Sequence, residues 1–93
     1  MTRPGNDRYR IEYLDSVVEE DIPRLPKTAR TVIQRAIEER LTVDPIGLGK
    51  PLRFSLNGHR RLRVGDYRIV YRIDFDERIV TIVIIKHRKE VYE

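Results

Sequence analysis

Two β-strands joined by a tight turn are predicted by the stretch Arg60-Arg-Leu-Arg-Val-Gly-Asp-Tyr-Arg-Ile-Val-Tyr-Arg-Ile73. The turn falls at Gly65-Asp66. In the second strand the tyrosines and isoleucines at odd positions alternate with Arg68, Val70 and Arg72 at even positions. Alternate side chains of a strand point to opposite faces of a sheet. The stretch therefore predicts an antiparallel sheet with one face on the core and one facing solvent.

Three further stretches have the pattern of strands. Residues 8–14 alternate charged and apolar side chains, and residues 52–56 can form a short strand closed by the Asn57-Gly58 turn. Residues 78–86 are apolar on both faces, which indicates an interior strand. The polar segment 74–77 joins this strand to the preceding one as a hairpin loop.

Two helices are predicted between the first strand and the remaining ones. Asp15 or Ser16 can cap the first, which Pro23 ends. From Thr28 to Thr42 apolar residues recur every three or four positions, as in an amphipathic helix. The order of these elements, one strand, two helices and then several strands, predicts a single α+β domain over residues 1–93. In it, two N-terminal helices pack on one face of a small, mainly antiparallel β-sheet.

Composition limits the classes of function. The 93-residue chain contains no cysteine, which excludes disulfides, thiolate metal sites and thiol nucleophiles. The longest apolar run, residues 79–85, is too short to span a bilayer, and the polar N-terminus lacks the apolar stretch of a signal peptide. We therefore expect a cytoplasmic protein with no membrane partner.

Positive charge is concentrated in the second half of the chain. Residues 1–45 hold 8 Lys and Arg against 9 Asp and Glu, whereas residues 46–93 hold 11 against 6, a net charge of +5. Such asymmetry favours an anionic partner, although exposed strand faces also need charge for solubility.

Strand alternation places much of this charge on one surface. If Leu62 and Val64 point into the core, their neighbours on the same strand point to the opposite face, together with Arg68 and Arg72. The end of the last strand is expected to add His87, Arg88 and Lys89. Arginine binds phosphate oxygens through two parallel hydrogen bonds, and an exposed tyrosine such as Tyr92 can stack on an unpaired base. The predicted RNA-binding residues are His59, Arg60, Arg63, Arg72 and Lys89.

No metal or cofactor site is predicted. Asp74, Asp76 and Glu77 share a hairpin, where acidic residues are usual for turns, and two histidines are too few for a site without further ligands. The segment Gly47-Leu-Gly49-Lys50 lacks the spacing of a nucleotide-binding loop.

Four segments together resemble the RelE/ParE superfamily of bacterial toxin–antitoxin toxins, most closely its RelE branch, over nearly the whole chain. They are Ala36-Ile-Glu-Glu-Arg-Leu41 leading to Asp44-Pro45, Gly49-Lys-Pro-Leu52, Arg61-Leu-Arg-Val-Gly-Asp-Tyr-Arg-Ile-Val-Tyr71 and His87-Arg-Lys-Glu-Val-Tyr92.

The resemblance implies a metal-independent endoribonuclease that cuts mRNA in the ribosomal A site by attack of the 2′-hydroxyl. It also implies a cognate antitoxin protein as partner, in a hetero-oligomer that can bind operator DNA. By position, Arg68 and Arg88 would stabilise the charge on the scissile phosphate and Tyr92 would orient a base. Arg61 stands where close relatives often have lysine.

Arginine cannot serve as a general base, because its pKa exceeds about 12. We therefore expect His87 to act as the general base or acid, because histidine ordinarily titrates near neutrality, with His59 as the second candidate. The predicted catalytic set is Arg61, Arg68, His87, Arg88 and Tyr92.

Two other functions stay open. A ParE-like gyrase inhibitor would share the fold without a hydrolytic site. A catalytically weak relic would keep only antitoxin binding, an alternative that the arginine at position 61 keeps open.

Overall fold

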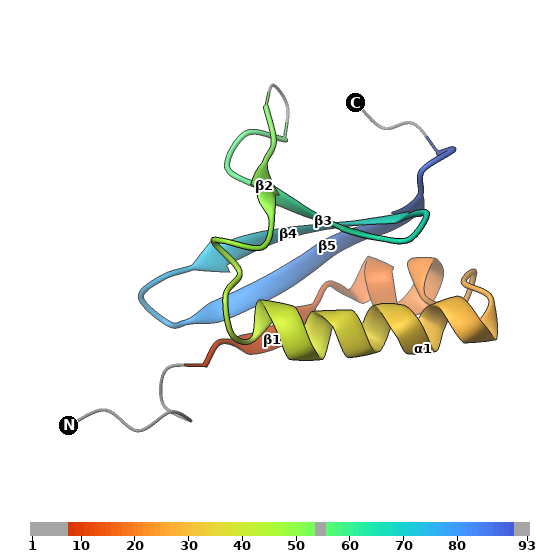
Figure 1. Ribbon diagram of the computed structural model, residues 1–93, viewed down its shortest axis with the longest axis horizontal. Helices are drawn as coiled ribbons and strands as arrows, with labels where there is room; N and C mark the ends of the chain where they lie inside the picture. Colours follow the sequence, from red (N-terminus) through yellow and green to blue (C-terminus); the bar gives the residue numbers. More distant parts are fainter. Residues whose placement is uncertain (1–7, 54–55, 91–93) are drawn as a thin grey trace.

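The computed structural model describes residues 8–53 and 56–90 (Figure 1). Its elements, in chain order, are β1 (Arg10–Tyr13), η2 (Val17–Asp21), α1 (Lys27–Ala36), η3 (Ile37–Leu41), β2 (Lys50–Pro51), β3 (Arg60–Val64), β4 (Tyr67–Asp74) and β5 (Ile79–His87). The α+β class predicted from the sequence is confirmed.

The five strands form one mixed sheet in the order β1-β5-β4-β3-β2. β1 runs parallel to β5, and the other neighbours are antiparallel. The interior position predicted for the strand at residues 78–86 is confirmed, since β5 lies between β1 and β4. The strand expected at residues 52–56 is displaced: β2 covers only Lys50–Pro51, and residues 54–55 lie outside the described part of the chain.

The helical layer lies against one face of the sheet (Figure 1). The prediction of two N-terminal helices is not confirmed in that form, because the helical residues between 17 and 41 form two π-helical segments and one α-helix. In η2 the amide of Ile22 donates to the carbonyl of Val17, five residues earlier. Asp21, the last residue of this wide turn, accepts a hydrogen bond from the Ile85 amide at 2.9 Å, so its carboxylate occupies the edge of β5 just beyond β1.

The core lies between the helices and the sheet. The helical segments contribute Val17, Ile33, Ile37 and Leu41, and the sheet contributes Leu62, Ile69, Tyr71, Val80, Ile82 and Ile85. These residues are almost fully buried, which confirms the inward face predicted for β4. Along the described ranges 8–53 and 56–90, no helix has the length and apolar character needed to cross a membrane.

A clamp holds the connection between η3 and β2 against the sheet. The Tyr71 hydroxyl donates to the carbonyl of Pro45 at 2.5 Å, and Nη2 of Arg60 donates to the carbonyls of Ile46 and Gly49 at 2.7 and 3.3 Å. A side chain at Gly49 would place its Cβ on the Tyr71 hydroxyl, so only glycine fits there.

Replacing Arg60 with methionine should lower the free energy of unfolding by about 1–2 kcal/mol, because the loop loses charge-assisted hydrogen bonds. Urea unfolding measures this loss. Arg63→Met is the matched control, since Arg63 is exposed on the same strand and its loss should cost less than about 0.5 kcal/mol. Equal losses of unfolding free energy in both variants would contradict this role of Arg60.

Tyr71 should make the protein sensitive to alkaline pH. Burial raises the pKa of its hydroxyl above the ordinary value of 10.0, partly offset by the nearby Arg60 guanidinium. The folded protein therefore keeps this proton after the unfolded chain has released it, so the stabilisation is complete below about pH 10 and declines above it. We expect the stability advantage of the native protein over Tyr71→Phe, in urea unfolding, to shrink between pH 9 and pH 11. An advantage that is constant or grows over this interval would contradict the assignment.

Candidate functional site

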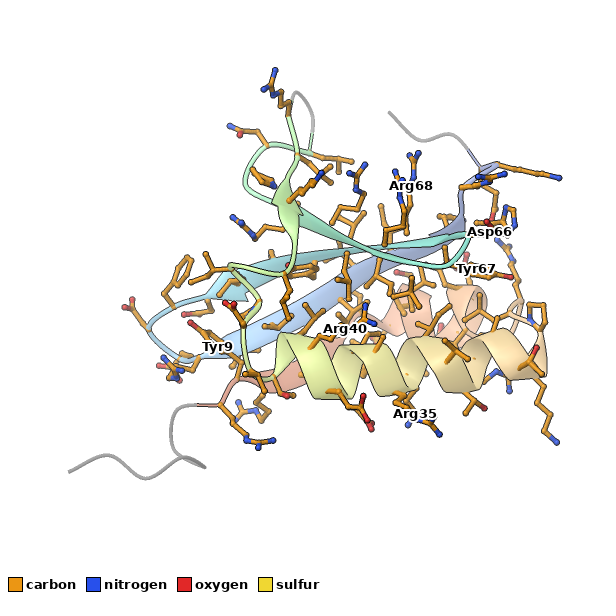
Figure 2. All side chains as sticks on the ribbon, in the orientation of Figure 1. Tyr9, Arg35, Arg40, Asp66, Tyr67 and Arg68 are labelled. Atoms are coloured by element: carbon orange, nitrogen blue, oxygen red, sulfur yellow. The ribbon has the colours of Figure 1, made fainter. Side chains whose placement is uncertain are left out.

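A row of three cations crosses the sheet on the face opposite the helices. The strand register pairs Arg63 of β3 with Arg68 of β4, and Arg68 with Lys86 of β5. Directly opposed side chains in neighbouring antiparallel strands have Cβ atoms about 5 Å apart. Figure 2 shows Arg68 pointing away from the helical layer, on which Arg35 and Arg40 lie. We call Arg63, Arg68 and Lys86 the cationic row.

Arg68 lacks a carboxylate partner within the described residues. Its Nε is buried and makes no hydrogen bond there. Its cross-strand neighbours on both sides are cations. Like charges held this close repel one another, and an unpaired buried donor costs free energy. An anion with several oxygens, such as a phosphate, would relieve both costs.

Lys86 was not predicted from the sequence as part of the site. It is brought there by a register shift between Val70 and Tyr71 in the β4–β5 pairing. Ile82 and Ile85 both point into the core although they are three residues apart, so the alternation of β5 changes phase between them. Lys86 consequently lies on the outer face, where it also makes ion pairs with Asp21 at 3.8 Å and Glu90 at 3.9 Å.

His87 is placed differently from the prediction. It pairs with Tyr67, whose side chain lies on the helix side of the sheet. The two rings pack edge to face, with their centroids 5.1 Å apart. Its Nδ1 accepts the Lys89 amide at 3.1 Å, and its side chain lines a small cleft with Asp21 and Arg24. The expected convergence of His87 with the outer arginines is therefore wrong, and the phase change in β5 is the physical reason.

Arg88 follows the last residue of β5 and lies beside the turn that holds Asp66. Its amide donates to the Asp66 carbonyl at 2.7 Å, and its Nε lies 3.7 Å from a carboxylate oxygen of Asp66. The turn after β5 is closed by His87 and Glu90, through hydrogen bonds of 2.8 and 3.1 Å. Arg88 is thus held at the end of the sheet at which the cationic row lies.

Arg61 lies on β3 two residues before Arg63, in the neighbouring row of cross-strand pairs on the same face. It pairs with Lys50 of β2 on one side and with Val70 of β4 on the other. Val70 is completely buried although it is on the outer face. The aliphatic stems of long neighbouring side chains can cover such a residue while their charged ends stay in water.

The remaining predicted residues do not gather at this place. Arg60 points to the helix side and belongs to the clamp, and His59 lines a separate cleft with Phe75. Arg72 is exposed further along the outer face, where Asp74 and Asp76 line the same hollow. Lys89 is exposed in the terminal turn. Tyr92 lies outside the described residues.

The outer face carries cationic side chains of the kind that can bind a polyanion. In the part of the chain that the structure covers, no three His, Asp or Glu side chains gather as metal ligands. Guanidinium groups can bind phosphate oxygens and stabilise a developing negative charge. Within the row, Lys86 is ion-paired with Glu90 at 3.9 Å.

Comparison with known proteins agrees with this fold. Residues 13–92 match the family model of the ParE toxin of the type II toxin–antitoxin system parDE. Two toxins of Mycobacterium tuberculosis are similar over 72 residues, or 77% of this chain: toxin RelG at 35% identity, with 83% of its length covered, and toxin RelE at 39%, with 74% covered.

Solved structures show the same arrangement. The RelBE2 toxin–antitoxin complex from Mycobacterium tuberculosis contains a chain with a TM-score of 0.82 and 30% identity, covering 89% of this chain and 94% of that one. A RelE–RelB complex from Pyrococcus horikoshii has a TM-score of 0.69 at 22% identity, covering 90% and 99%, and supports the fold alone. With the family model matching most of the chain and two curated toxins above 30% identity, this protein belongs to the RelE/ParE superfamily of type II toxin–antitoxin toxins.

Proposed function

We propose that this toxin is a ribosome-dependent mRNA endoribonuclease that cuts in the A site without a metal ion and so inhibits translation in the cytoplasm. The observation that carries the proposal is the cationic row, in which Arg68 has no acidic partner within the described residues and stands between two other cations. Such an array suits a phosphate, because it offers many hydrogen-bond donors on one face of the sheet.

Attack by a 2′-hydroxyl on the adjacent phosphate builds negative charge on the phosphoryl oxygens. Arg68 and Arg88 would stabilise that charge from one end of the outer face, and Arg61 and Arg63 would hold the flanking phosphates. Tyr92 would orient a base by stacking. Preorganised charge stabilisation is the main catalytic contribution in this proposal, since the described residues bring no histidine to the row.

Antitoxin binding is the second part of the proposal. The similar chain from Mycobacterium tuberculosis is part of a toxin–antitoxin complex. A partner segment carrying carboxylates would complement the unpaired arginines of the outer face and block RNA there. The complex would in turn bind operator DNA through the antitoxin.

Arg68→Ala should lower the single-turnover rate of mRNA cleavage on programmed ribosomes by about 10²–10³-fold, the usual loss for a preorganised donor to a developing oxyanion. His87→Ala should lower it less than about tenfold, because His87 lies on the helix side. A loss of 10²-fold or more for His87→Ala would restore it as the general acid or base. Circular dichroism of each variant verifies that it is folded.

The family model takes its description from ParE, so gyrase inhibition is the second candidate. Induction in bacteria, with mapping of mRNA 5′ ends and of DNA breaks, separates the functions. The proposal predicts new mRNA ends at a fixed codon position on translated messages. DNA breaks with intact mRNA would support gyrase inhibition instead. Neither effect would support a relic that only binds antitoxin.

A further inference from the structure

Asp66 is the only residue of the two-residue β3–β4 turn with a functional side chain. Gly65 precedes it with a positive φ of 57°, a backbone conformation that glycine adopts readily, so the turn is tight. The carbonyl and the carboxylate of Asp66 both face Arg88, at 2.7 Å from its amide and 3.7 Å from its Nε. One turn residue therefore contacts both the backbone and the guanidinium of Arg88.

The geometry of this ion pair leaves Arg88 able to bind a second anion. A guanidinium carries five N–H donors, and the contact with Asp66 engages Nε. Among the described residues, Asp66 is the one ion-pair partner of Arg88. A phosphate can thus approach the terminal edge while the carboxylate remains on the Nε side.

The contact with Asp66 restrains Arg88, which lies just beyond the end of β5 at His87. An arginine beyond the end of a strand loses considerable side-chain entropy when it is held in one direction. A catalytic group that is already oriented in the free enzyme avoids that cost in the transition state.

We propose that Asp66 is a positioning residue that orients Arg88 toward the scissile phosphate. This inference rests on the proposed RNA cleavage. Asp66 would not touch the RNA itself but would hold Arg88 in the geometry that the reaction needs. Since the pair is exposed, its effect should be two- to fivefold in rate, the range of an exposed ion pair.

The test compares single-turnover cleavage of mRNA on programmed ribosomes for Asp66→Asn, Arg88→Ala and the double variant. Asparagine keeps the size of the side chain and removes its charge. At saturating ribosomes Asp66→Asn should lower the rate two- to fivefold without weakening binding. In the Arg88→Ala background it should change nothing, because the group that it orients is gone. Asp76→Asn, in the other hairpin, removes the same charge far from Arg88 and should leave the rate unchanged.

A second measurement is independent of cleavage. The heteronuclear NOE of the Arg88 Nε–H group in labelled protein should fall in Asp66→Asn and not in Asp76→Asn. Two results would overturn the positioning role alone, provided that the native protein cuts mRNA. One is that Asp66→Asn has the same effect on the rate with and without Arg88, and the other is that it leaves the NOE unchanged. A native protein that cuts no mRNA overturns the proposed function itself.

Discussion

The pairing of β4 with β5 determines which side chains reach each face of the sheet. Its register shift between Val70 and Tyr71 changes the phase of β5, so that Ile82 and Ile85 both reach the core. The same shift sends Lys86 outward to Arg68 and His87 inward to Tyr67. One irregularity in a ladder thus decides which titratable and charged groups share a face, as β-bulges near functional sites are known to do.

The two faces of the sheet have separate tasks. The inner face carries the helices, and its polar groups are used structurally: Tyr71 and Arg60 hold the connection to β2, and Asp21 satisfies the Ile85 amide at the sheet edge. On the outer face Arg61, Arg63, Arg68 and Arg72 make no ion pair with any residue that the structure describes. Arginines left unpaired on a rigid sheet are suited to bind a polyanion without rearrangement, because the strands already fix their spacing.

The sequence predicts the structure correctly where a regular period governs it. The alternation of residues 67–73 predicted that Arg68 lies opposite the buried Tyr71, and the spacing of residues 28–42 predicted the α1 region. The sequence did not reveal which faces His87 and Lys86 occupy, because residues 78–86 are apolar on both faces and show no phase change. The role of Arg60 was also hidden, since its partners, the Ile46 and Gly49 carbonyls, are backbone groups of a loop whose path depends on tertiary packing.

RNA binding to the outer face of the sheet can be measured residue by residue with NMR. A short single-stranded RNA with 2′-O-methyl groups, which cannot be cut by 2′-hydroxyl attack, is titrated into labelled protein at low salt. We expect the side-chain resonances of Arg61, Arg63, Arg68 and Arg88 to shift together, while the His87 ring and the α1 amides stay unchanged. Shifts confined to the helical face, or centred on His87, would show that RNA does not bind the outer face.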